Sequence, residues 1–318
     1  MKKVTKERAI SVKVMLVLTL FIFSCQQTPR DEDILPEVPP GAEAMTIQGR
    51  PLYAGEPSMP LKERMRLAKE EWERDKDDAD NLIWYGRRVA YTGAYREAIR
   101  IFSKGIDLFP DDARMLRHRG HRYITIREFP RAVADFEMAA AMVEGEEDEV
   151  EPDGMPNPLN IPVSTLHSNI YYHLGLARYL LGDREGALEA WDTDMALAVN
   201  DDMKVATMHW IYMALRELGR NEEARQRIDA ITDDMNIIES HAYHKLCLFY
   251  KGEITEYDLT DGDFSDIMND AILYGIGNWH LYHNGDAGRA MEYFDRILQG
   301  PSWASFGFIA AEVRLESI

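Results

Sequence analysis

The sequence has little cysteine, no excess of positive charge and no strand-like pattern. Only Cys25 and Cys247 occur among its 318 residues, and Cys247 lies in an apolar helical stretch, where we expect a buried free thiol. The formal net charge of −19 argues against nonspecific nucleic-acid binding, which requires basic side chains that neutralise phosphates. No long alternating run rich in Val or Ile is present, which argues against a sheet.

The familiar sequence motifs of enzymes are also missing. There is no Gly-x-Ser-x-Gly elbow, no Walker loop and no His-Glu-x-x-His pair, and the isolated Gly275-Ile276-Gly277 lies in a helical context. We therefore expect a non-catalytic protein with no cofactor and no resident metal.

The N-terminus has the organisation of an export signal. A basic leader at 1–13 precedes an apolar stretch at 14–23, which is too short to span a bilayer as a helix. The stretch ends Ile22-Phe23-Ser24-Cys25, and this arrangement resembles a bacterial lipoprotein signal. The resemblance implies a signal peptide at 1–24, lipidation of Cys25 and a membrane-anchored protein of the bacterial cell envelope, at the periplasmic or surface face of the outer membrane. An ordinary secretion signal or an N-terminal anchor is the alternative.

Residues 25–60 are expected to form a flexible tether. They lack a clean period, and residues 26–60 hold seven of the 14 prolines.

A spacing of 34 residues then recurs in the body of the chain. Five positions match in one register: Gly86 with Gly120, Tyr95 with Phe129, Ala98 with Ala132, Phe102 with Phe136, and Gly105 with Ala139. This pattern resembles the tetratricopeptide repeat (TPR), a helix-turn-helix unit of 34 residues. A third copy contains Gly175 and Trp191, and weaker copies follow to about residue 300.

The resemblance implies an all-α fold, a right-handed superhelical solenoid of antiparallel helix pairs with about five to six repeats. We place this solenoid at 61–318, with a capping helix at each end and a degenerate unit whose first helix is 242–252. Glycines at the helix crossings and at the turns fit the plan, since a turn after a helix favours a left-handed residue. An acidic, proline-rich insertion at 144–162 interrupts the array, and we favour a solvated loop there.

In TPR proteins the first helix of each unit lines a concave groove. Carrying those positions over predicts a partner-binding groove that combines Arg and His with aromatic side chains: Arg87, Tyr91, Arg114, Arg117, His121, Asn169, Tyr172, His209, Arg216, Trp279, Tyr282 and His283. Guanidinium groups suit carboxylates, so the expected ligand is a protein or peptide with an acidic or carboxylate group. The alternative is that half of these side chains pair with the protein's own acids, including those of the insertion.

Three histidine pairs share i, i+3 spacing, namely His118/His121, His241/His244 and His280/His283. Such pairs can present two imidazoles to one metal, but these occupy different positions within their units. The expected function is a non-catalytic envelope scaffold or adaptor. The alternatives are a His-rich groove enzyme or metal-binding or small-molecule-binding protein, and an outer-membrane assembly factor.

Overall fold

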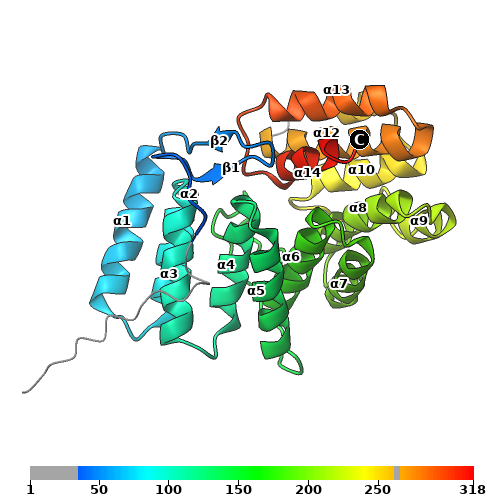
Figure 1. The fold of residues 1–318 in the computed structure, drawn as a ribbon. Coiled ribbons are helices and arrows are strands. Elements are labelled where there is room, and N and C mark those ends of the chain that lie inside the picture. Colours follow the sequence, from blue (N-terminus) through cyan, green and yellow to red (C-terminus); the bar gives the residue numbers. More distant parts are fainter. Residues whose placement is uncertain (1–34, 261–265) are drawn as a thin grey trace, which may run out of the picture. The chain divides into compact units, whose positions relative to one another are not determined.

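The computed structural model describes residues 35–260 and 266–318, and for residues 266 and 267 it describes the backbone alone. The predicted signal peptide and Cys25 lie outside the described residues. The described part of the chain contains fourteen α-helices, one π-helix and one two-stranded antiparallel hairpin (Figure 1). The elements are β1 (Ala44–Met45), β2 (Pro51–Leu52), α1 (Met59–Arg74), α2 (Ala79–Tyr91), α3 (Tyr95–Leu108), α4 (Ala113–Thr125), α5 (Phe129–Met142), α6 (Leu166–Leu180), α7 (Arg184–Leu197), α8 (Asp201–Glu217), α9 (Asn221–Ile228), α10 (His241–Lys251), α11 (Glu256–Thr260), α12 (Asp266–Trp279), η2 (His280–Asn284), α13 (Ala287–Leu298) and α14 (Phe306–Leu315).

The helices pack as sequential pairs, which confirms the predicted all-α, TPR-like fold. The pairs α2/α3, α4/α5, α6/α7, α8/α9 and α12/α13 form five complete units among the described residues, and each pair contacts the next along the chain. Helix α10 packs mainly on α8 and α12 instead, because only the five-residue α11 follows it. This is the degenerate unit expected at 242–252. None of the helices in the described part of the chain combines the length and apolar character that a membrane crossing requires.

The predicted crossing glycines lie where two helices approach closely. A Cβ on Gly86 would lie 2.6 Å from the ring of Phe102, and one on Gly120 would lie 2.9 Å from the ring of Phe136. The aromatic ring of the second helix therefore fills the space that each glycine leaves free. This contact explains the 34-residue repeat of a glycine followed by an aromatic residue.

Turn glycines follow the first helices of most units with left-handed backbones, as predicted. In the second unit Arg127 occupies the corresponding turn with a φ of 68°. A side chain there gives the turn a long-range contact. Arg127 Nε donates to Glu312 Oε2 of α14 at 3.0 Å, and Nη2 donates to the carbonyl oxygen of Trp303 at 2.8 Å.

The segment expected as a tether is partly built into the body. Within 35–60, the β1–β2 hairpin buries Ala44 and Leu52 in the main hydrophobic cluster, and α1 begins at Met59. The hairpin also contacts the end of the chain, because Gln48 Nε2 donates to the carbonyl oxygen of Glu312 at 3.4 Å. Residues 35–60 therefore belong to the folded body, which corrects that part of the expected tether.

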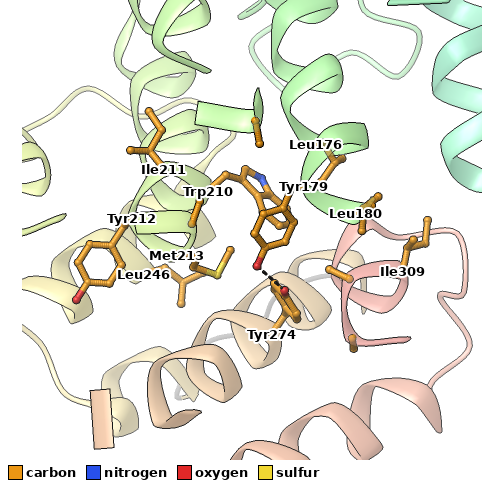
Figure 2. Packing of buried hydrophobic residues seen from close by; sticks show 14 of the residues in the cluster. Leu176, Tyr179, Leu180, Trp210, Ile211, Tyr212, Met213, Leu246, Tyr274 and Ile309 are labelled. Carbon is orange, nitrogen blue, oxygen red and sulfur yellow. Dashed lines mark hydrogen bonds between the residues drawn. The ribbon is translucent and has the colours of Figure 1, made fainter. Parts of the chain in front are cut away.

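The C-terminal helix α14 packs on α12, α13 and α6, so the end of the array contacts its middle. Figure 2 shows Ile309 of α14 near Leu176 and Leu180 of α6. In the same core Tyr179 of α6 and Tyr274 of α12 point toward each other, with their hydroxyl oxygens 2.8 Å apart. The inner side of the middle units is thus filled by later helices of the same chain.

Candidate partner-binding surface

The insertion between α5 and α6 folds back over the first helices of the array. Residues 149–165, which we call the strap, close on themselves where Val150 pairs with Thr165 in an antiparallel bridge. Glu151 N donates to the carbonyl oxygen of Ser164 at 3.1 Å, and Leu166 N donates to that of Glu149 at 2.9 Å. The strap is therefore held at its base and is not a fully solvated loop.

The strap reaches α4 through a buried ion pair. Oε2 of Glu151 lies 2.9 Å from Nε of Arg117, and the two residues are 9% and 7% exposed. Asn169 of α6 donates to the same carboxylate oxygen at 3.1 Å. Arg117 and Asn169, both predicted to line the groove, are thus brought together around an acid of the chain itself.

The strap then crosses α2. Arg87 Nη2 donates to the carbonyl oxygen of Pro152, and Arg88 Nη1 donates to that of Gly154, each at 2.7 Å. Gly154 packs so closely on Tyr91 that a Cβ there would lie 1.8 Å from the phenol oxygen. Only glycine fits this crossing without a shift of the strap or of the Tyr91 ring.

The far end of the strap meets the segment before α10. The side-chain amide of Asn157 donates to the carboxylate of Glu239 and, at 2.6 Å, to the carbonyl oxygen of Ile161. The strap therefore passes from α2 to the N-terminal side of α10, across the inner face of the array.

Beneath the strap lies a cavity of about 110 Å³. Its walls come from α2, α3, α4 and the strap, and most of its polar groups are basic or aromatic: Arg87, Ala90, Tyr91, Phe102, Arg117, His118, His121, Arg122 and Glu151. Three guanidinium groups and one carboxylate line this space. The cavity therefore has a basic lining in a chain whose net charge is −19.

The histidines around the cavity are neutral. Burial, reinforced by the neighbouring arginines, lowers the pKa of His118 and of His121 well below the usual value. The pKa of His173 on α6 is lowered in the same way. The rings of His121 and His173 lie with their centroids 4.6 Å apart and are tilted by 37°, a close approach that is compatible with two uncharged imidazoles.

A second cluster gathers the predicted residues of the later units. Arg216 Nη2 donates to the carbonyl oxygen of Tyr282 at 2.9 Å, and Arg216 Nη1 lies 3.2 Å from His283 Nδ1. The rings of Trp279 and His283 stack at 4.5 Å with an interplanar angle of 12°. The free space among these residues is only about 10 Å³, so their polar groups mainly satisfy one another.

Three predicted groove residues lie elsewhere. Arg114 is at the α2–α4 edge, where it pairs with Asp80 and with Asp112, the N-cap residue of α4. The Tyr172 hydroxyl accepts from Trp210 Nε1 at 2.8 Å. His209 is fully buried, 3.0 Å from the Tyr250 hydroxyl, and its position inside the core corrects its assignment to a groove.

The members of each histidine pair have different partners. His118 stacks on Phe102, whereas His121 contacts the ring of His173 at a tilt. His244 Nε2 lies 2.7 Å from the Thr232 carbonyl oxygen, and His280 Nε2 lies 2.9 Å from Glu256. No group of three or more His, Cys, Asp or Glu side chains within the described ranges is arranged to hold a metal ion.

The prediction missed Arg122 and Glu151. Arg122 could have been found from the composition of α4, whose segment 113–125 carries four arginines and two histidines but no acid. Glu151 is one of seven acids between 144 and 153, and nothing in the sequence distinguishes it from the others.

No protein-family model matches this sequence. No curated protein matches it either. Among solved structures, the chain is similar to YrrB, described as a TPR protein with an unusual peptide-binding site, at 16% identity and a TM-score of 0.42 over 80% of this chain and 100% of that one.

Two crystal structures of MamA also show a likeness, each at 16% identity. One covers 61% of this chain and 92% of MamA with a TM-score of 0.43. The other covers 65% and 89% with a TM-score of 0.41. Because these scores are low, the TPR-like assignment stands on the helix pairs and the glycine–aromatic crossings of the chain itself.

Proposed function

We propose that this protein is a non-catalytic scaffold or adaptor that binds an acidic, extended segment of a protein partner. The binding surface is the face of α2 and α4 that the strap covers, with Arg87, Tyr91 and Arg117 as its central residues. The partner segment takes the place of the strap.

The observation that carries this proposal is the manner in which the strap is bound. An extended acidic segment lies across α2 and α4, with its Glu151 carboxylate on Arg117 and two of its carbonyl oxygens on Arg87 and Arg88. Arginine forks recognise carboxylates, and main-chain carbonyl contacts suit any extended peptide. A segment of similar charge from another protein can make the same contacts.

The strap also has the properties of a displaceable segment. It contains no helix, and beyond Gly154 most of its residues are exposed. Its large apolar side chains Met155, Leu159 and Ile161 are 59%, 64% and 47% exposed, so they contribute little burial that would hold it down. Opening the strap therefore costs chiefly polar contacts. These are the contacts at Glu151, Pro152, Gly154 and Asn157 and the hydrogen bond that Asn200 donates to the Val163 carbonyl oxygen.

The test uses the full-length chain carrying Glu151→Gln, which weakens the hold of the strap, and a labelled peptide with the sequence of residues 149–155. Fluorescence anisotropy should show binding at least tenfold tighter than that of the same peptide with glutamine at the position of Glu151. Adding Arg117→Gln to the protein should abolish this preference. Equal binding of both peptides, or none of either, would overturn the proposal.

A physiological partner can then be sought by crosslinking in cells. Capture should increase with Glu151→Gln and disappear with Arg117→Gln. A protein captured equally by both variants binds elsewhere on the surface.

We also propose that the protein acts in the bacterial cell envelope, anchored through a lipid on Cys25. The leader at 1–13, the apolar stretch at 14–23 and the position of the cysteine support this. Cells fed an alkyne-labelled fatty acid should label the wild type and the Cys247→Ala variant but not Cys25→Ala, and only Cys25→Ala should leave the membrane fraction. Label that persists on Cys25→Ala would contradict the anchor.

A further inference from the structure

The cavity beneath the strap has an uneven distribution of charge. Arg117 is paired with Glu151, whereas Arg87 donates to a main-chain carbonyl oxygen, which carries no full charge. Arg122 stacks over the Tyr95 ring at 5.6 Å, and it forms no ion pair with any residue that the structure describes. The carboxylate of Asp153 in the strap also interacts electrostatically with Arg87. The cavity lining nevertheless holds three guanidinium groups and one carboxylate, and Arg122 has no carboxylate partner of its own among the described residues.

A buried positive charge without a nearby anion costs free energy, and Arg87 and Arg117 are both buried. Burial lowers the pKa of Arg122 to about 10, and Arg117 and Arg87 contribute to the effect by repulsion. The one carboxylate in the cavity lining, that of Glu151, is paired with Arg117, and Arg122 forms no ion pair of its own. An anion placed among the three guanidinium groups would relieve this repulsion.

The cavity has room for such an anion. Its volume of about 110 Å³ approaches the ~150 Å³ that suffices for a benzene molecule in an engineered protein cavity. Its polar lining differs from that apolar example, because Tyr91, His118 and His121 add hydrogen-bonding groups to the three guanidinium groups. A phosphate-sized anion matches both the space and the donors.

We infer that the cavity formed by Arg87, Arg117 and Arg122 beneath the strap is a binding site for an oxyanion of phosphate size. The three guanidinium groups of the lining outnumber its one carboxylate, and this excess of donors and positive charge suits an anion such as hydrogen phosphate. The site goes beyond the proposed partner-binding surface, since it is present while the strap is closed and needs no peptide.

The first probe is inorganic phosphate, titrated into the wild-type chain by calorimetry and by thermal unfolding at constant ionic strength. Sulfate tests for any dianion, acetate for a single carboxylate, and chloride for simple screening. A ligand that binds only the folded state raises the unfolding temperature saturably. We expect phosphate, and more weakly sulfate, to do so, whereas acetate and chloride should have little effect.

Arg122→Gln is the matched variant, because it removes one positive charge and leaves the Glu151–Arg117 pair in place. It should weaken phosphate binding at least tenfold and should fold at least as stably as the wild type without phosphate. Arg100→Gln on the exposed face of α3, where Arg100 pairs with Glu97, serves as the control and should bind phosphate like the wild type.

Equal phosphate binding by the two arginine variants, equal shifts with chloride, or no saturable shift would overturn the inference and indicate an adventitious ion only. Because these titrations use no peptide, their failure leaves the proposed partner-binding function intact. The converse also holds, since loss of acidic-peptide binding would not affect the phosphate result.

Discussion

Arg117 of α4 and Glu151 of the strap form a buried ion pair, with Nε and Oε2 2.9 Å apart. The pair joins the predicted groove with the acidic insertion. We favoured a solvated loop for the insertion, and the pairing of groove side chains with its acids was the alternative. Each partner depends on the other, because removing one member of a buried pair leaves an uncompensated charge.

The first prediction concerns Glu151→Gln. Breaking a buried pair typically costs about 3–5 kcal/mol, but here the strap can open and let water reach Arg117. We expect the free energy of unfolding to fall by less than about 3 kcal/mol, while amide hydrogen exchange in 149–165 becomes much faster. Urea unfolding and exchange mass spectrometry measure the two effects.

The control for this experiment is Glu147→Gln, an exposed acid of the same insertion. It should change neither measurement. Unchanged exchange in the strap of Glu151→Gln, combined with a full loss of about 3–5 kcal/mol, would show that the strap is a fixed part of the fold.

The sequence predicted the structure of the array more fully than that of the strap. The glycine–aromatic contacts, such as Gly86 with Phe102, are imposed by the helix crossing itself, so they leave a periodic trace in the sequence. The strap has no period, and its placement depends on a few contacts, such as that of Gly154 with Tyr91, between residues far apart in the chain. The sequence therefore allowed the insertion's acids as partners of the groove only as an alternative, and it did not identify Glu151 or Gly154 as the contacts.

The second prediction uses the pH dependence of stability at His209. Burial lowers its pKa to about 3 from a usual 6.5, and Nε2 has no hydrogen-bond partner among the described residues. A histidine whose pKa is lowered in the folded state contributes stability that is fully present above pH 6.5. This stability is lost as the pH falls toward 3, because only the unfolded state takes up the proton. By pH 5 the loss from this residue should reach roughly 2 kcal/mol.

His209→Gln removes this titration while keeping an acceptor for Tyr250. Below pH 6.5 its free energy of unfolding should fall less steeply than that of the wild type, by up to about 1.4 kcal/mol per pH unit. Chemical denaturation between pH 4 and 7 measures the slope. The exposed His241 provides the comparison, and His241→Gln should retain the wild-type slope. If the free energies of unfolding of His209→Gln and of the wild type changed in parallel with pH, His209 would not be a neutral, buried residue.

His209 also illustrates why the site was predicted only in part. Groove residues and core residues of this kind both lie on the inner side of a unit's first helix. The repeat pattern does not tell whether that side faces solvent or is covered by other helices. Here α10 and α12 bring Tyr243, Tyr250 and Tyr274 against the α8 helix, so the expected groove residue becomes a core residue. The packing of α10 and α12 on α8 determines this outcome, and it has no local signature in the sequence.

The third prediction concerns the attachment of α14. Glu217 of α8 is buried and paired with Arg184 and with Arg314, and it accepts a hydrogen bond from Tyr179. Although burial opposes its charge, Arg314 and Arg184 hold the pKa of Glu217 below its usual value. Glu217→Gln should cost about 3–5 kcal/mol, because both guanidinium groups lose their anion.

The loss should be accompanied by local exposure of α14, which limited proteolysis near residue 306 can detect. Glu222→Gln, which removes an exposed i,i+3 pair with Arg225, should change stability by less than about 1 kcal/mol. A Glu217→Gln variant as stable as the Glu222→Gln variant would show that α14 is held by its apolar contacts alone.

The fourth prediction is a stabilising substitution at Asp194. This carboxylate is 1% exposed and accepts from Ser168 Oγ and Thr207 Oγ1, each at 2.5 Å. Burial raises its pKa to about 6 from 3.8. A raised carboxyl pKa favours folding most below pH 3.8, and this stability is lost as the pH rises through 6, so near pH 7 the charged group costs about 3 kcal/mol.

Asp194→Asn keeps the shape and removes the charge. Its amide oxygen can accept from Ser168, and its NH₂ can donate to the Thr207 hydroxyl. That hydroxyl can then turn its own hydrogen to the Met203 carbonyl oxygen, which lies 3.0 Å away. The variant should be more stable than the wild type at pH 7 by about 1–3 kcal/mol, with the difference vanishing toward pH 4. Denaturant unfolding at the two pH values tests this, and a variant that is less stable at pH 7 would mean that the ionised carboxylate is fully compensated by its two hydroxyl donors.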